Sequence, residues 1–280
     1  MRQTNPTVAH LADLTWEEIR TRAAGDPVVV LPTGSIEQHG PHLPTRVDTL
    51  LVTSVCEEAV RRASARIDVL LAPTVWMGLS THHTGYFTLT LTFDTYQQVI
   101  TELLESLIRT GFKRLLIING HGGNTDPLHL TVTRVRDRHK VLVATADYWD
   151  VARAELDLIR ESGPGGMGHA CEFETSMVMH LQPAAVRTDR IQAEYPPGIP
   201  GWFTIDMTKP GGPVKLGTRF EDITRRGVVG DPTLATSDKG RRFFEAAVGR
   251  LEHLLVSFAT WTIENGISPG TAGAHSGTRE

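Results

Sequence analysis

Four short apolar runs alternate with amphipathic segments along the first half of the chain. Each run is continuously hydrophobic and rich in Val, Ile and Leu, the pattern of a strand that is buried on both faces. The runs span residues 27–32, 69–72, 114–118 and 141–145. Strands that alternate with helices predict an α/β fold, here an α/β/α sandwich in which helices cover both faces of a mostly parallel sheet.

The segments between these runs carry apolar residues at helical spacing. They predict helices over about 48–65, 94–107 and 127–138. Asp94 and Thr95 can cap the second of these helices. Because parallel strands end at the same edge of a sheet, we expect the polar residues that directly follow the strands to converge there.

Length and composition fit one folded domain. The chain has 280 residues, of which 40% are hydrophobic and 21% charged, values near those of average globular proteins. We expect an N-terminal segment over 1–26, a domain over 27–265, and a flexible tail rich in Gly, Ser and Thr over 266–280. Two stretches rich in Gly and Pro, 161–168 and 195–217, are candidates for a lid.

Charge, hydropathy and cysteine count narrow the range of partners. A net charge of -4 and a pI near 6.3 give no basic field, so nucleic acid is not an expected partner. No run of about 18 apolar residues is present and the N-terminus lacks the apolar core of a secretory signal, so a membrane is not expected either. Cys56 and Cys171 are too few for a disulfide framework, which favours the reducing cytoplasm.

The first polar cluster follows the run at 27–32. Glu37, His39, His42 and Asp48 lie close together in the sequence, and carboxylates mixed with imidazoles suit a divalent ion such as Zn²⁺ or Mn²⁺. Glu37 and His39 are two positions apart, so an extended backbone would point both to the same side. The alternative is a surface loop in which Asp48 only begins the next helix.

Two later clusters also carry candidate ligands. His121 stands between glycines at the end of a predicted strand, where missing side chains leave room for a ligand, although a tight turn with an incidental histidine has the same pattern. His169, Glu172 and Glu174 begin an apolar helix, and an ordinary capped helix start would look alike. We interpret Cys171 as a small buried residue rather than a nucleophile.

Taken together, these clusters resemble the creatininase family of metal amidohydrolases. The likeness lies in four ordered segments: GSIEQHGPHLP from position 34 with Asp48 after it, NGHGGN at 119–124, HACEFETS at 169–176 and GDPTLATSDKGRR at 230–242. Four ordered motifs are far more specific than any one of them. The resemblance spans about 27–255 and implies an α/β fold, a homohexamer, and two divalent ions per subunit, Zn or Mn with Fe as a further option.

The resemblance also implies a set of metal ligands. One ion would be held by Glu37, Asp48 and His121, and the second by His39 and Asp48. In the creatinine-hydrolysing members a fifth ligand is a glutamate two positions after the histidine of NGH, and this chain has Gly123 there. Glu172 is therefore expected to replace the missing ligand from another loop.

The implied chemistry is hydrolysis by a hydroxide that bridges the two ions, because bound metal lowers the pKa of water to near neutrality. His169 matches the catalytic histidine of the family and would deliver a proton to the leaving group. Glu174 is expected to orient a ligand or His169.

Candidate substrate residues follow from the same resemblance. Trp149 lies in a Tyr-Trp-Asp run like that of creatininases and would form a pocket wall, although a core tryptophan is the alternative. His82 and His83 begin a segment that resembles one in relatives that do not act on creatinine, but it lacks their Pro-Gly. The second tryptophan that creatininases carry before the catalytic histidine is replaced by GPGGMG, which argues against creatinine.

We therefore expect a metal-dependent amidohydrolase that cleaves a C–N bond of a small cyclic or linear amide. The alternatives within the family are the opening of a cyclic polyol ketone by C–C cleavage and the processing of a precursor peptide. A non-catalytic, metal-stabilised oligomer subunit is a rival of a different class, and His169 with the ligand set argues against it.

Overall fold

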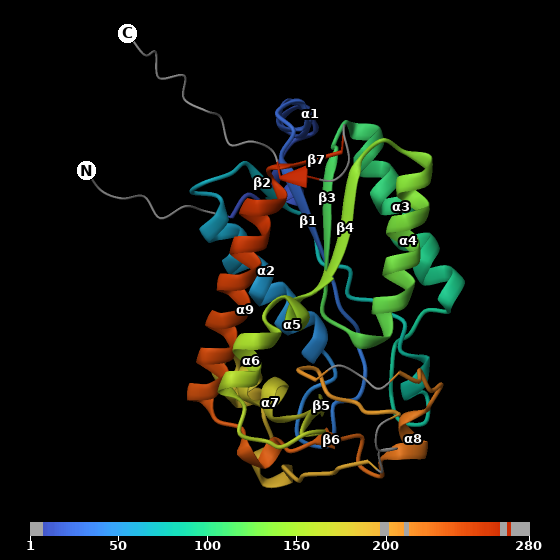
Figure 1. The fold of residues 1–280 in the computed structure, drawn as a ribbon, viewed down its shortest axis with the longest axis vertical. Coiled ribbons are helices and arrows are strands. Elements are labelled where there is room, and N and C mark those ends of the chain that lie inside the picture. Colours follow the sequence, from blue (N-terminus) through green and yellow to red (C-terminus); the bar gives the residue numbers. More distant parts are fainter. Residues whose placement is uncertain (1–7, 197–201, 210–212, 264–267, 270–280) are drawn as a thin grey trace, which may run out of the picture.

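A four-stranded parallel sheet in the order β2-β1-β3-β4 forms the centre of the computed structural model (Figure 1). The structure describes residues 8–196, 202–209, 213–263 and 268–269. The strands are β1 (Val28–Thr33), β2 (Val69–Leu71), β3 (Arg114–Asn119) and β4 (Leu142–Asp147). The four predicted strands are therefore confirmed, and all their pairings are parallel.

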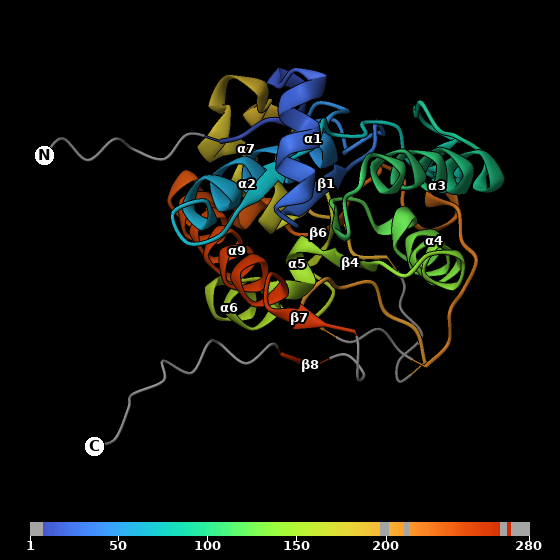
Figure 2. The ribbon, with the colours of Figure 1, turned by 90° about the horizontal axis from the view of Figure 1, so that it is seen from above.

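Helices cover both faces of this sheet, as Figures 1 and 2 show. Side chains of Val28 and Val30 point into one core and those of Val29 and Leu31 into the other, which explains why the strands are apolar throughout. Two long helices lie on each side: α2 (Val47–Ala63) and α9 (Ser237–Phe258) on the first, and α3 (Phe93–Thr110) and α4 (Thr125–Arg138) on the second. The predicted α/β/α sandwich is confirmed.

Shorter elements complete the described part of the chain. The remaining helices are α1 (Trp16–Ala24), α5 (Tyr148–Val151), α6 (Arg153–Ile159), α7 (Glu172–Leu181) and α8 (Phe220–Ile223). Two antiparallel pairs join β5 (Met167–His169) to β6 (Val229–Gly230) and β7 (Trp261–Thr262) to β8 (Ser268–Pro269). Short 3-10 turns occupy Leu11–Asp13, Thr81–His83, Gly122–Asn124, Pro183–Ala185, Thr188–Arg190 and Pro232–Leu234.

The carboxyl ends of three strands lie in register. Thr33 of β1 pairs with Asn119 of β3, and Asn119 pairs with Asp147 of β4. The chain leaves all three strands at the same edge, where Figure 1 shows α5, α7, β5 and α8 gathered below the sheet. The predicted convergence of the polar segments at this edge follows from that register.

Helix boundaries differ slightly from expectation. The side chain of Thr92, and not Asp94 or Thr95, caps α3, because its hydroxyl accepts a hydrogen bond from the backbone N–H of Thr95 at 3.3 Å. The predicted tail at 266–280 lies outside the described residues except for β8, and so does part of the 195–217 segment. None of the described helices is both long and apolar enough to cross a membrane.

Gly240 allows α9 to approach α7 closely. A Cβ at this position would lie 1.9 Å from the backbone oxygen of Ser176, a distance that no pair of nonbonded atoms adopts. Gly249, on the same helix, has no atom within 4 Å of its own ideal Cβ position. The two glycines therefore form a matched pair.

We expect Gly240→Ala to lower the free energy of unfolding by about 1–3 kcal/mol, since it forces apart two helices that are packed backbone to backbone. Gly249→Ala should raise it by up to about 1 kcal/mol, because alanine is the better helix former. Urea denaturation of both variants measures these changes. Equal effects at the two positions would contradict the close approach.

Candidate metal centre

Glu37, Asp48 and His121 converge at the carboxyl edge of the sheet. Nδ1 of His121 lies 3.0 Å from Oδ2 of Asp48 and 3.3 Å from Oε2 of Glu37, and all three side chains are buried. Yet neither carboxylate oxygen accepts a hydrogen bond from any described residue. Buried carboxylate oxygens and an imidazole nitrogen that converge without a hydrogen bond between them are arranged as ligands around a cation.

A second group shares Asp48. Nε2 of His39 lies 3.0 Å from Oδ1 of Asp48 and 3.8 Å from Oε1 of Glu174. Asp48 therefore directs one oxygen to each group, which is the arrangement of a carboxylate that bridges two ions. Asp48 lies in the first turn of α2, but no side chain caps that helix, so the alternative role as a simple cap is not seen.

Backbone carbonyls fix how His39 and His121 face the centre. Nδ1 of His39 lies 3.1 Å from the carbonyl oxygen of Glu37, and Nε2 of His121 lies 3.1 Å from that of Leu79. A carbonyl only accepts, so each of these nitrogens carries a hydrogen and the opposite ring nitrogen faces the carboxylates, where it holds a proton or binds a cation. Such outward hydrogen bonds are typical of metal-bound histidine.

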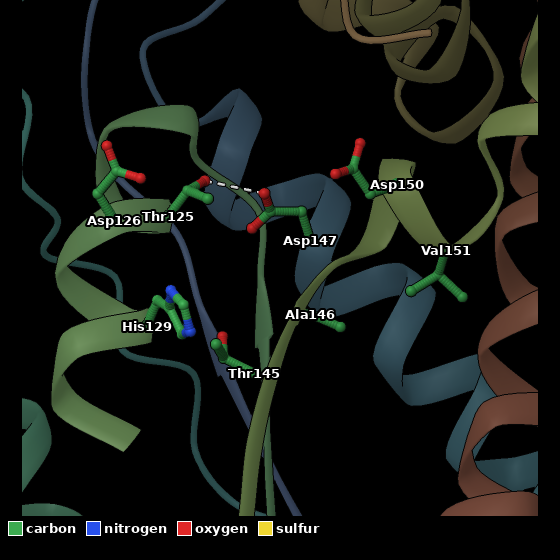
Figure 3. A pocket seen from close by; sticks show the side chains of 8 residues that line it. All are labelled: Thr125, Asp126, His129, Thr145, Ala146, Asp147, Asp150 and Val151. Atoms are coloured by element: carbon green, nitrogen blue, oxygen red, sulfur yellow. Dashed lines mark hydrogen bonds between the residues drawn. The ribbon is translucent and has the colours of Figure 1, made fainter. Parts of the chain in front are cut away.

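Asn119 holds the loop that carries His121. Its side-chain oxygen accepts from the backbone N–H of His121 at 3.1 Å, and its amide nitrogen donates to Asp147 at 2.7 Å. Asp147 also accepts from Thr125 at 2.9 Å, the dashed contact in Figure 3, where both residues line a separate surface hollow. The ends of β3 and β4 thus place His121 through a hydrogen-bonded chain.

The buried carboxylates of this centre need positive charge close to them. Burial would raise the pKa of Glu37, but the imidazoles of His121 and His83 hold it well below its usual range. Burial would lower the pKa of His121, yet Glu37 and Asp48 raise it to about 10. Without a metal ion, protons on the histidines therefore balance the buried carboxylates, and a divalent ion would displace them.

Glu172 does not join this centre. Its carboxylate accepts hydrogen bonds from Nζ of Lys239 at 2.7 Å and from the backbone N–H groups of Glu161 and Ser162 at 3.0 and 2.8 Å. These contacts hold the pKa of Glu172 below its usual value even though burial opposes this. The expected replacement ligand is therefore satisfied elsewhere, and Glu174, two positions later, is the carboxylate that faces His39.

Gly123 has no room for a side chain in this backbone. A Cβ there would lie 2.2 Å from the carbonyl oxygen of Leu79 and 2.5 Å from Nε2 of His121. A glutamate at this position would require a different loop. The geometry is consistent with a carboxylate that arrives from α7 instead.

His169 lies against both ligand groups. Its ring is 4.2 Å from that of His39, and its Nδ1 lies 3.7 Å from Oε1 of Glu37. Its Nε2 lies 2.7 Å from the carbonyl oxygen of Gln38. Burial, together with the charges of His39 and His83, holds the pKa of His169 well below its usual value, so this imidazole is neutral near pH 7.

A cavity of about 180 Å³ opens onto these groups. The three residues named from sequence as substrate contacts, Trp149, His82 and His83, all line it. Further walls come from residues that the sequence did not reveal: Ile205, Met207 and Phe220. No periodic pattern marks them, because they lie in or beside the irregular Pro/Gly-rich segment, which contributes directly to the cavity.

His42 stands apart from the ligand groups. Its Nε2 lies 2.9 Å from the hydroxyl oxygen of Thr175, and burial lowers the pKa of His42 to about 4. Cys171 is fully buried, and burial raises the pKa of its thiol well above the usual value. Neither has the geometry of a ligand or nucleophile.

Known proteins share this sequence and fold. The creatininase family model, described as creatinine amidohydrolase, matches residues 12–255. The mycofactocin precursor peptide peptidase of Mycobacterium tuberculosis (strain ATCC 25618 / H37Rv) is 33% identical over 252 residues, which cover 87% of this chain and 89% of that protein. The creatinine amidohydrolase of Pseudomonas putida is 29% identical over 260 residues (85% and 92%), and the 3-dehydro-scyllo-inosose hydrolase of Thermotoga maritima 26% over 268 residues (89% and 83%).

Solved structures show the same architecture. Two creatininase structures, one described as a manganese form and the other as a mutant of Zn-Zn type, each superpose with a TM-score of 0.71 at 26% identity. Each match covers 89% of this chain and 97% of the other. The likeness therefore extends over almost the whole fold and includes the segments that carry the candidate ligands.

The two glutamates of α7 are a matched pair for testing the ligand set. Glu174→Gln should reduce the bound metal from about two ions per chain toward one, because His39 and Asp48 lose the third ligand of their group. Glu172→Gln should leave the metal content unchanged. It should instead lower the free energy of unfolding by roughly 1–3 kcal/mol, since buried Lys239 loses its charged acceptor.

Metal content is measured by elemental mass spectrometry after dialysis, and stability by urea denaturation of the metal-free proteins. Loss of metal in Glu172→Gln with full occupancy in Glu174→Gln would reverse the assignment.

Proposed function

The chain belongs to the creatininase family of metal-dependent hydrolases, and from that membership we propose that it hydrolyses a C–N bond of a small amide or peptide. The observation that carries the proposal is the convergence of two ligand groups on Asp48, beside a neutral histidine and a cavity. A hydrolase site needs all three features within reach of one substrate bond.

Two divalent ions fit the groups that converge here. Glu37, Asp48 and His121 would hold one, and His39, Asp48 and Glu174 the other. Imidazole and carboxylate ligands without a thiolate suit Zn²⁺ or Mn²⁺, with iron as a further option, and the two related creatininase structures are of those first two types. Bound ions would supply Lewis-acid polarisation of the substrate carbonyl and an acidified water.

The sequence suggested that Glu174 only orients a ligand or His169, whereas in this proposal Glu174 itself binds metal. The sequence places it two positions after Glu172, and only Glu174 lies near His39. Glu172 instead stabilises the start of α7 through its contact with Lys239. The number of carboxylates at the centre is thus kept, while the residue that supplies the last one changes.

His169 is suited to move a proton during hydrolysis. Its Nε2–H donates to the carbonyl of Gln38, so the lone pair on Nδ1 faces Glu37 and the cavity. Because the imidazole is neutral near pH 7, Nδ1 can accept a proton from the attacking water and then donate it to the leaving nitrogen. A C–N bond needs this second step, since an amide anion is a poor leaving group.

The cavity walls favour an amide with an apolar part. Trp149, Phe220, Ile205 and Met207 surround the space above the ligand groups. A cyclic polyol would leave its hydroxyl groups against these side chains without partners, at a cost for each buried group. C–C cleavage of a polyol ketone is therefore the weaker alternative, although one relative is named as such a hydrolase.

Processing of a precursor peptide is the second candidate. It is favoured by the 33% identity to the mycofactocin precursor peptide peptidase, against 29% to the creatinine amidohydrolase. The same centre would serve either substrate, because both reactions cleave an amide bond. Creatinine itself is disfavoured, because the stretch before His169 is rich in glycine and carries no tryptophan.

We further propose that the protein is a cytoplasmic homohexamer that acts without a nucleic-acid or membrane partner. Cys56 and Cys171 are both free and buried, as suits a reducing compartment. The hexamer rests on the family resemblance alone. Light scattering of the purified protein should give a mass of six chains, and a monomer would contradict it.

A substrate panel with a matched variant tests the reaction. The panel holds N-acyl dipeptides, cyclic amides, creatinine and a cyclic polyol ketone. We expect the metal-loaded protein to hydrolyse an amide or peptide, and His169→Ala to lower kcat by about 10²–10⁴-fold without loss of metal, as removal of a proton-transfer group does.

His253→Ala, a change at an exposed histidine of α9, is the control and should leave kcat unchanged. Turnover of the polyol ketone alone would overturn the C–N proposal. An unchanged kcat in His169→Ala would remove that residue from proton transfer.

A further inference from the structure

A side pocket of about 190 Å³ adjoins the cavity at the metal centre. Ile205 lines both hollows, so this one side chain marks the boundary between them. Aromatic and aliphatic side chains provide much of the surface of the side pocket, among them Tyr195, Phe203 and Ile223. None of the described residues that line it carries a charge. The side pocket is therefore suited to an apolar group.

Three segments of the chain form walls of both hollows. The segment 164–169 lines the side pocket at its start and the cavity at its end. Helix α8 faces the cavity with Phe220 and the side pocket with Ile223. The segment 203–207 lines the side pocket before Ile205 and the cavity after it. Hollows that share three walls in this way are compartments of one site.

A buried ion pair anchors the wall that separates the two compartments. The carboxylate of Asp206 accepts hydrogen bonds from Nη1 of Arg160 at 2.8 Å and from the backbone N–H of Gly165 at 2.7 Å. The side chains of Asp206 and Arg160 are both buried. Ile205 and Met207, which flank Asp206 in the sequence, both line the cavity. The anchor between them holds these two side chains at the boundary.

Neither hollow alone has the size of an ordinary ligand pocket. Such pockets have volumes of about 300 Å³ or more. The cavity measures about 180 Å³ and the side pocket about 190 Å³, so only the two together reach this range. A substrate that filled both would place its scissile amide at the metal centre and an attached group beyond Ile205.

We propose that the side pocket is a specificity subsite for an aromatic or branched aliphatic group that is attached next to the scissile amide. Ile205 is the boundary that this group passes. The proposal rests on the hydrolase function proposed above and names its substrate class: amides with a large apolar substituent, in preference to compact cyclic ones. The gain in binding comes from the apolar surface that such a group removes from water.

Hydroxamates test the subsite without turnover, because their two oxygens chelate a bound metal ion. Isothermal titration calorimetry on zinc-loaded protein compares acetohydroxamate with 3-phenylpropanohydroxamate, extended on the acyl side, and N-benzylacetohydroxamate, extended on the nitrogen side. We expect at least one phenyl compound to bind about 10-fold or more tightly than acetohydroxamate, as filling an apolar pocket does. Binding of acetohydroxamate without this gain would overturn the subsite and leave the hydrolytic centre in place. Absence of binding by all three would overturn the metal centre and the subsite with it.

Methyl NMR locates the bound group in the same complexes. The protein is labelled with ¹³C at the δ1 methyl groups of isoleucine, and Ile223→Val assigns the signal of Ile223, which lines the side pocket but not the cavity. We expect the tighter phenyl compound to shift this signal through its ring current and acetohydroxamate to leave it in place. An unmoved Ile223 signal with that phenyl compound bound would overturn the proposal, whether or not any substrate is found.

Thr204→Trp and Trp202→Ala form a matched pair of variants. Thr204 is exposed and lines the side pocket, so a tryptophan there can fill the pocket without entering the core. Trp202 is also exposed, and it is not among the described residues that line either hollow. We expect Thr204→Trp to bring the ratio of the two dissociation constants, phenyl compound against acetohydroxamate, toward unity, and Trp202→Ala to preserve it. A preserved ratio in Thr204→Trp, or an equal loss in both variants, would overturn the proposal.

Discussion

The burial of three carboxylates at one point is the constraint on which the rest of this site depends. Glu37, Asp48 and Glu174 are each almost inaccessible to solvent, and a buried charge is tolerated only with opposite charge nearby. Protonated histidines around the carboxylates provide this positive charge, and bound metal ions would replace their protons. The in-register strands at the carboxyl edge of the sheet place the loops, and the outward hydrogen bonds of His39 and His121 turn the other ring nitrogen of each toward the carboxylates.

Much of this arrangement could be predicted from sequence, because its causes are local. The strands are visible in the sequence as continuous apolar runs, because each is buried on both faces. Since they run in the same direction, the segments after β1 and β3 reach the same edge of the sheet. Glu37 and His39 are two positions apart, so an extended backbone points both to the same side, and His121 follows a strand end directly. The cavity wall formed by Phe220 could not be found this way, because a helix of four residues such as α8 is too short to show a periodic pattern.

The choice between Glu172 and Glu174 shows where sequence reasoning reaches its limit. Both lie in the first turn of α7, and residues two apart on a helix point in nearly opposite directions, so only one of them can face His39. Which one does so depends on the rotation of the helix about its axis. That rotation is set by contacts with residues far away in sequence, and no local pattern encodes it.

The last of the four family segments, residues 230–242, supplies those contacts. Gly240 lets α9 lie against the backbone of Ser176, and the neighbouring Lys239 reaches Glu172 on the side of α7 away from the ligand groups. A buried ion pair adds little net stability, because desolvation offsets the attraction, but it strongly disfavours any rotation that would separate the charges. The pair between Glu172 and Lys239 therefore fixes α7 in the one orientation that turns Glu174 toward His39. Glu172 therefore affects the metal centre by fixing the orientation of α7 and not by binding metal.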